Sequence, residues 1–161
     1  MSQVATHRDS ERRHAWRDVF EAHAAIMELL AAELKDEAGI SITEYDVLLH
    51  LSEMPPPVRM HELADRVVLS RSGVTRLIDR LVRDGWVERS ACSTDARGAE
   101  AVLTASGLDR LRAASPTHLR GISDHFLETM DATQLTAVNR AMKAVLAALG
   151  ADAPPEEQRP D

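Results

Sequence analysis

The sequence contains a single cysteine, Cys92, among its 161 residues. An intrachain disulfide is therefore excluded, and a reducing compartment is the expected environment. No hydrophobic run approaches the roughly 18 residues that a membrane-spanning helix needs. The N-terminal segment MSQVATHRDSERRHAW also lacks the apolar core of a signal peptide. We therefore expect a cytoplasmic protein without a membrane partner.

Aromatic residues are scarce, at 3% of the chain. The hydrophobic core must therefore be built mainly from Leu, Val, Ile, Ala and Met side chains. The hydrophobic fraction of 44% is nevertheless ordinary for a folded protein. A chain of this length can bury a sizeable core, as one domain or as two intimately joined ones.

Sequence motifs of catalysis and of metal binding are missing. There is no Gly-x-Ser-x-Gly motif and no phosphate-binding loop, and no histidine lies near Cys92 in the sequence. Of the seven histidines, none forms a His-x-His or His-x₃-His pair. His118 and His125 would lie about 10.5 Å apart along a helix axis, too far to share an ion. We expect no enzymatic activity, no cofactor and no metal site.

Positive charge is concentrated in one part of an acidic chain, whose formal net charge is -7. Residues 66–97 contain seven arginines and four acidic residues, a net charge of +3, which leaves -10 for the remainder. Such a basic region favours contact with a polyanion. On charge alone, a solvated helix face is the more ordinary explanation.

The N-terminal part of the chain is expected to form one long helix. Apolar side chains recur every three or four residues through residues 10–38, with Gly39 as the stop: Trp16, Val19, Phe20, His23, Ile26, Met27, Leu30 and Leu34. At about 42 Å, this helix is too long for one small domain to cover, which indicates a partner subunit.

After this helix the pattern changes to short elements. Thr43 is expected to cap a helix through Leu51, with Asp46 as the capping-box acid. Three prolines follow, and then a helix over residues 59–67. Ser70 is expected to cap a helix over residues 71–84 that stops at Gly85.

Residues 86–90 and 100–104 then read as two short strands around a polar loop. Thr104 is expected to cap the next helix, which Pro116 would kink or split, with Ser115 able to start it afresh. Asp131 and Gln134 cap a last helix through Leu149, and the Pro- and charge-rich tail 150–161 is expected to be disordered.

The helix over residues 71–84 has two different faces. At 100° per residue, Val74, Leu77, Ile78 and Leu81 form one apolar stripe, and the opposite face carries Ser72, Thr75, Arg76, Asp79 and Arg83. Small hydroxyl side chains let a helix approach DNA closely, and arginine can bind guanine or phosphate through two hydrogen bonds. Helix, tight turn, helix and strand-loop-strand together form the layout of a winged helix-turn-helix.

The segment LADRVVLSRSGVTRLIDRLVRDGWVERSACSTDARGAEAVLTASG resembles the core of the MarR family of bacterial transcriptional regulators. The resemblance lies in a recognition helix ending in a basic-acidic-Gly turn, a wing with Asp-x-Arg at the tip, and a return strand that enters the next helix as Val102-Leu103-Thr104-Ala105-Ser106-Gly107. The flanking helices match in layout over residues 10–149. The resemblance implies a homodimer with intertwined terminal helices, each recognition helix in a major groove and each wing arginine in a minor groove.

The resemblance and the helix pattern together give the candidate DNA-binding residues. Arg97 is implied at the wing tip and in the minor groove, and Asp95 is implied to orient neighbouring arginines. Arg89 at the wing base fits a phosphate contact, whereas Arg76 and Thr75 are the best base-reading candidates, with Ser72 not separated from them. The full set is Ser70, Arg71, Ser72, Thr75, Arg76, Arg83, Arg89, Asp95 and Arg97.

Family members often bind small amphipathic or phenolic effectors in a crevice between the dimer arms and the winged domain. By layout, the lining residues would be Trp16, Phe20, His23, Tyr45 and Leu49, although the same residues serve equally well as core. Cys92 falls in the wing loop, where it is an ordinary small residue or a site of oxidation.

We therefore predict a mainly α-helical protein with a small β-wing. Residues 10–39 and 105–149 form the helical dimerisation region, and residues 43–104 form the winged helix-turn-helix domain. The predicted function is that of a homodimeric repressor that binds a palindromic DNA operator and responds to a ligand. The alternatives are a winged-helix module for protein contact, which the arginine-rich face disfavours, and a helical-bundle enzyme, which lacks acid-base residues.

Overall fold

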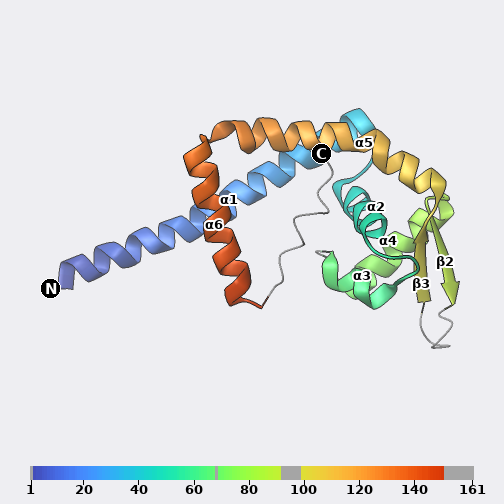
Figure 1. Ribbon diagram of the computed structural model, residues 1–161, viewed down its shortest axis with the longest axis horizontal. Coiled ribbons are helices and arrows are strands. Elements are labelled where there is room, and N and C mark those ends of the chain that lie inside the picture. Colours follow the sequence, from blue (N-terminus) through green and yellow to red (C-terminus); the bar gives the residue numbers. More distant parts are fainter. Residues whose placement is uncertain (1, 68, 92–98, 151–161) are drawn as a thin grey trace.

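The computed structural model describes residues 2–67, 69–91 and 99–150 (Figure 1). None of the helices that it describes is both long and apolar enough to cross a bilayer. The elements in chain order are α1 (Ser2–Ala38), α2 (Ile42–Glu53), β1 (Val58–Arg59), α3 (Met60–Arg66), α4 (Arg71–Arg83), β2 (Val87–Ala91), β3 (Ala99–Leu103), α5 (Ala105–His125), the short 3₁₀ helix η1 (Leu127–Thr129) and α6 (Ala132–Ala148).

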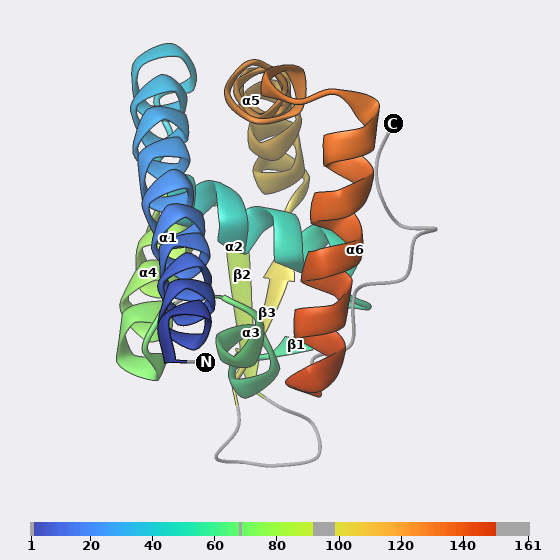
Figure 2. The same ribbon diagram turned by 90° about the vertical axis from the view of Figure 1, so that its left-hand side faces the viewer.

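The chain forms a small body at one end of an extended helical frame (Figure 1). The body consists of α2, α3, α4 and the sheet, and α5 leads away from it with the second half of α1 packed alongside. The first half of α1 projects beyond the frame, and α6 folds back from the far end of α5. Figure 2 shows α1 and α6 standing apart on opposite sides. This mainly helical architecture with a small sheet confirms the predicted winged helix-turn-helix fold.

The sheet has three antiparallel strands in the order β1-β3-β2. β2 and β3 pair from Val87 with Leu103 to Ala91 with Ala99, which confirms the two predicted strands to within one residue. β1 was not predicted, because two residues directly after three prolines are too few to show an alternating pattern. Its Val58 pairs with Ala101, and both side chains are buried, at 1% and 0% exposure.

The core of the body is aliphatic, as the scarcity of aromatic residues predicted. All four side chains of the α4 stripe are buried, in one cluster with residues from α1, α2, α3 and the strands: Val74, Leu77, Ile78, Leu81, Leu34, Val47, Leu48, Leu63, Val58 and Val87. Each such side chain contributes about 1.5–3 kcal/mol relative to an exposed one. This burial fixes which face of α4 points outward.

Helix caps follow the expectations at three of four positions. Ser70, Thr104 and Asp131 cap α4, α5 and α6, and Gly39 ends α1 with a φ of 65°. The predicted cap of α2 is wrong, since Ser41 takes that role.

Ser41 is extended, and its hydroxyl accepts from the Glu44 amide, while the Glu44 carboxylate accepts from the Ser41 amide at 2.8 Å. Thr43 therefore lies inside the helix, and Glu44 rather than Asp46 closes the capping box.

Two other expectations about the long helices are wrong. α1 begins at Ser2 rather than at residue 10, because residues 2–9 contain neither Gly nor Pro to stop a helix. α5 continues through Pro116 as one helix, so the alternative in which Pro116 splits it is wrong.

Proline removes the hydrogen bond to the Arg112 carbonyl, and its ring crowds that carbonyl. The turns on either side stay packed, since Ala114 and Thr117 are both buried. Ser115 does not start a new helix, and its hydroxyl donates instead to the Leu111 carbonyl at 2.9 Å.

The start of α5 lies directly against the turn between α4 and β2. The Thr104 amide donates to the Trp86 carbonyl at 3.1 Å, and its hydroxyl donates to the Gly85 carbonyl at 2.8 Å. The same hydroxyl oxygen accepts from the Gly107 amide at 3.0 Å. A Cβ atom at position 107 would lie only 2.1 Å from the Trp86 carbonyl oxygen. Only glycine therefore permits this approach.

We predict that Gly107→Ala destabilises the protein. At an open helix position, glycine to alanine would stabilise by about 1 kcal/mol, so a loss of stability identifies the clash with the backbone. We expect a loss of about 1–3 kcal/mol in urea unfolding. Ser106→Ala, at the exposed preceding position, is the matched control and should change stability by less than about 0.5 kcal/mol. A Gly107→Ala protein as stable as wild type would contradict the close approach.

Candidate nucleic-acid interface

α3 and α4 form the helix-turn-helix, with α4 on the outside. α3 ends at Arg66, and the Leu69 amide donates to the Val67 carbonyl at 2.8 Å, which tightens the turn. Ser70 then caps α4, and its hydroxyl accepts from the Gly73 amide at 3.1 Å. The first turn of α4 therefore begins at Ser70, and the other backbone amides of that turn have no carbonyl partner within the helix. Such a helix terminus favours an anion.

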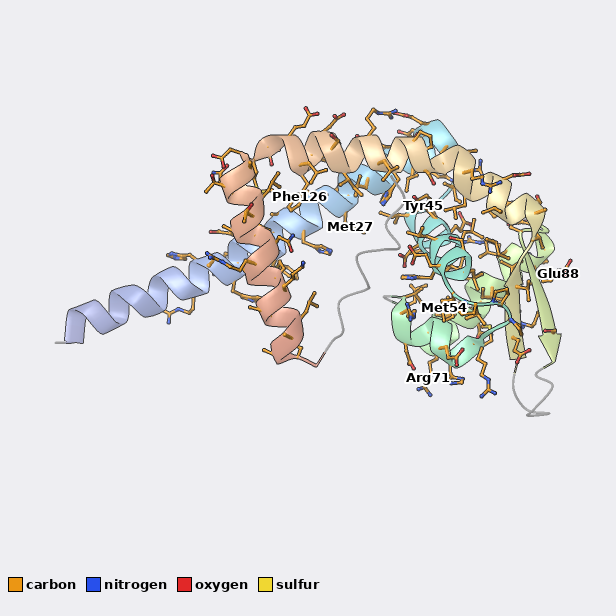
Figure 3. All side chains as sticks on the ribbon, in the orientation of Figure 1. Met27, Tyr45, Met54, Arg71, Glu88 and Phe126 are labelled. Atoms are coloured by element: carbon orange, nitrogen blue, oxygen red, sulfur yellow. The ribbon has the colours of Figure 1, made fainter. Side chains whose placement is uncertain are left out.

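The outward face of α4 carries the predicted polar side chains. Ser72, Thr75, Arg76, Asp79 and Arg83 are all exposed, and so is Arg71. Figure 3 shows Arg71 at the lower edge of the body, with its side chain directed away from it. The structure thus brings six of the nine DNA-binding candidates onto one helix and its cap: Ser70, Arg71, Ser72, Thr75, Arg76 and Arg83.

The hydroxyl groups of this face already have partners within the helix. The Ser70 and Ser72 hydroxyl oxygens lie 3.2 Å apart, within hydrogen-bonding distance of each other. The Thr75 hydroxyl donates to the Arg71 carbonyl at 3.1 Å. These bonds direct the three hydroxyl groups toward one another and toward the helix backbone.

Asp79 organises two of the arginines. Its carboxylate forms an ion pair with Arg89 Nη1 at 2.7 Å, across from α4 to β2. Its carbonyl accepts from Arg83 Nε at 3.3 Å. Arg89 is therefore tied to the recognition helix at the base of the wing, where the sequence placed it. The guanidinium group retains further donors that point away from Asp79.

Sequence reasoning missed Arg80, which lies at the edge of the outward face. Together with Arg76 and Arg83 it lines a surface groove of about 370 Å³ with Thr43, Leu69, Gly73 and Leu77. Arg80 forms an ion pair with Glu44 at 3.0 Å. A sequence signal was available, because Arg80 falls between the apolar and polar sectors of the helical wheel.

Glu44 keeps its negative charge beside this groove. Burial by itself raises the pKa of its carboxyl, but the two hydrogen bonds from Ser41 and the charges of Arg80 and Lys35 outweigh that effect. The net pKa is below the usual value for Glu. Glu44 therefore stays ionised at neutral pH and anchors Arg80 to α2.

The remaining wing candidates, Asp95 and Arg97, lie outside the described residues, as do Cys92 and the tail from residue 151. The strands that lead to the wing are described, and β2 carries Arg89 on the side of α4. The roles given to Asp95 and Arg97 remain predictions from the family resemblance.

The five candidate effector-binding residues fall into two groups. Trp16, Phe20 and His23 are exposed on the projecting half of α1, with the Trp16 and Phe20 ring centroids 6.5 Å apart. Tyr45 is buried and Leu49 half-buried on α2. Nothing in the described part of a single chain joins the two groups into one pocket, so this site remains a prediction.

Tyr45 belongs to a polar cluster between α2 and α5 (Figure 3). Its ring centroid lies 4.4 Å from that of His118, and its hydroxyl donates to the Ser115 hydroxyl at 3.4 Å. Burial raises the pKa of Tyr45 and lowers the pKa of His118. Burial also raises the pKa of Asp46, against the opposing effect of His50 and His118. Among residues 2–67, 69–91 and 99–150, no group of three or more His, Cys, Asp or Glu side chains is arranged to hold a metal ion.

Sequence comparison matches part of this chain, including the winged-helix segment, to known transcriptional regulators. A sequence model described as MarR family matches residues 38–98. The HTH-type transcriptional regulator YkoM of Bacillus subtilis is 32% identical over 90 residues, which are 56% of this chain and 58% of YkoM.

Two solved structures from Streptomyces coelicolor extend the similarity to nearly the full length. Sco3205, a MarR family transcriptional regulator in complex with DNA, is 30% identical with a TM-score of 0.78, over 93% of this chain and 96% of the other. AbsC, another MarR family transcriptional regulator, is 30% identical with a TM-score of 0.76, over 87% and 95%. Because these regulators are 30% identical over 87–93% of this chain, the chain belongs to the MarR family of transcriptional regulators.

Proposed function

We propose that this regulator binds DNA sequence-specifically, as a homodimer on a palindromic operator, and acts as a repressor that a small effector releases. The observation that carries the proposal is the outward face of α4, where arginines and short hydroxyl side chains lie together on a helix anchored by four buried residues. The Sco3205 structure, which contains DNA, supports it.

The uncovered terminal helices support the homodimer. α1 is exposed from Arg13 to Leu29 except for half-buried Ile26, and no residue of α6 is buried. Both helices nevertheless carry large apolar side chains that are 37–75% exposed: Trp16, Val19, Phe20, Met27, Leu29, Met142, Val145, Leu146 and Leu149. An isolated chain would expose this apolar surface to water, whereas a second copy would bury it.

We assign residues 10–39 and 105–149 to dimerisation and residues 43–104 to DNA binding. α5 connects the two regions, since it begins against the α4–β2 turn and packs along α1. A crevice between arms and body, with Trp16, Phe20 and His23 on one side and Tyr45 and Leu49 on the other, would hold an amphipathic or phenolic effector. Binding there would change the spacing of the two recognition helices.

Each DNA-binding candidate is given a role by its position. Arg76, with Thr75 and Ser72, would face base edges in the major groove, and Ser70 and Arg71 would contact phosphate at the start of α4. Arg83 and Arg89, both held by Asp79, would contact phosphate where the helix leaves the groove. Arg97 would enter the minor groove, with Asp95 orienting its neighbours.

The proposal predicts DNA binding that weakens steeply with salt. Several arginine–phosphate contacts should release counterions, with a slope of about −0.9 in log affinity per contact against log salt. Fluorescence anisotropy with duplex DNA from upstream of the protein's own gene, titrated at several salt concentrations, measures this slope. A winged helix used only for protein contact would bind neither this duplex nor a random one, and that result would overturn the proposal.

The proposal also predicts a dimer in solution. Sedimentation at micromolar concentration should give twice the 17.7 kDa chain mass. Val19→Glu in α1 or Val145→Glu in α6 should dissociate the dimer, because each places a carboxylate within the apolar surface.

Val82→Glu is the matched control for assembly. It changes an exposed valine of α4, away from the arms, and should leave the dimer intact. A stable wild-type monomer, or equal dissociation by all three variants, would refute the assigned interface.

The third prediction separates base reading from phosphate contact. Arg76→Ala should lose about 1–3 kcal/mol on the operator but much less on random duplex, because only a base reader distinguishes sequences. Arg83→Ala carries the same change of charge two turns later and should weaken both DNAs about equally and flatten the salt slope. Both variants are measured on both DNAs at several salt concentrations. Equal losses for Arg76→Ala on the two DNAs would move base reading to Ser72 or Thr75, or to DNA shape.

A further inference from the structure

Thr75 stands in the second turn of α4, on its exposed face next to Arg76. Its hydroxyl donates to the Arg71 carbonyl at 3.1 Å, so the one hydrogen that the hydroxyl can donate is already used. The hydroxyl is therefore turned against the helix backbone. The hydroxyl oxygen can still accept a hydrogen bond, but it can no longer donate one to a ligand, and the methyl is the apolar group that this side chain offers.

The other side chains of the outward face offer different chemistry. Ser72 has only a hydroxyl, which lies 3.2 Å from that of Ser70. Arg76 and Arg83 offer hydrogen-bond donors, and the Asp79 carboxylate is paired with Arg89. In the first two turns of α4, all of which the structure describes, Thr75 supplies the single exposed methyl. This part of the face therefore offers a ligand one apolar contact, from the Thr75 methyl, and a pair of hydrogen-bond donors, from the adjacent Arg76 guanidinium group.

That pattern matches a particular pair of bases in the major groove. Thymine is the base that carries a methyl group there, at its C5 position, and guanine offers two acceptors to arginine. Residues at the N-terminal end of a recognition helix are the ones that reach base edges.

We infer that Thr75 is a specificity-determining residue whose methyl packs on the C5 methyl of a thymine, once in each half-site. This inference rests on the proposed DNA-binding function.

Two substitutions separate the methyl from the hydroxyl. Thr75→Val keeps a methyl and removes the hydroxyl, whereas Thr75→Ser keeps the hydroxyl and removes the methyl. Neither should disturb the fold, because the position is exposed and the Arg71 carbonyl keeps its helical partner. Thermal unfolding of each variant confirms this before DNA binding is measured.

The complementary substitution is made in the DNA. Replacing one thymine by deoxyuridine removes its C5 methyl and leaves every hydrogen-bonding group in place. The probe is a duplex enriched from a random-sequence pool by the wild-type protein, with each thymine replaced in turn, at symmetric positions of both half-sites. Binding of wild type and the two variants is measured on every duplex.

One symmetric thymine position should respond. For wild type and Thr75→Val, deoxyuridine there should weaken binding about fourfold per half-site, the effect of one buried methyl. Thr75→Ser should bind the thymine duplex as weakly as wild type binds the deoxyuridine duplex, and it should not distinguish the two. Arg76→Ala should still distinguish them, which separates this contact from guanine reading.

The outcomes distinguish the inference from the function on which it rests. If wild type enriches a sequence but tolerates deoxyuridine at every position, DNA binding stands and the methyl contact is refuted. Loss of affinity in Thr75→Val but not in Thr75→Ser would also refute it, because the hydroxyl would then be the reader. If wild type enriches no sequence at all, the proposed function itself fails.

Discussion

The close approach of α5 to the α4–β2 turn is the constraint on which the arrangement of this protein depends. No side chain separates Gly107 from the Trp86 carbonyl, and Thr104 bonds to both sides of the contact. Arg110 reinforces it, with its guanidinium carbon 5.2 Å from the centre of the Trp86 ring and a hydrogen bond to the Ala38 carbonyl at the end of α1. One small region therefore fixes the end of the recognition helix, the start of the wing and both long helices relative to one another.

The recognition helix divides stability and function between its two faces. Its inner stripe is enclosed in the core cluster, so the orientation of the helix is set by buried residues and not by its exposed face. Its outer face consists of exposed side chains that contribute little to stability. A change on the outer face can therefore alter binding while the fold persists, and a change at the Gly107 contact would disturb the fold first.

Two acidic residues hold arginines of the basic surface in place. Asp79 ties Arg89 of the wing strand to the helix, and Glu44 holds Arg80 against α2. These pairs reduce the freedom of long side chains that would otherwise have to be ordered on binding. The basic region comprises residues 66–97, whereas residues 40–65 of the same body carry five acidic residues and one arginine. The charge distribution seen in the sequence thus corresponds to one basic region of the body, with acidic residues beside it.

The sequence by itself determined the elements whose signals are local. Apolar spacing predicted α4 and its buried stripe, and short cap patterns predicted Ser70, Thr104 and Asp131. It failed where several residues compete for one role, as when Ser41 rather than Thr43 capped α2. Pro116 was expected to kink or split α5, and no split occurs, because sequence shows the lost hydrogen bond but not the packing of Ala114 and Thr117 that holds the helix together. Only the tertiary structure decided which partners the outward side chains have and which of their groups remain available. The Thr75 hydroxyl is directed to the backbone, and Asp79 is joined to Arg89 ten residues away, because these contacts depend on angles and distances in space that spacing along a chain does not encode.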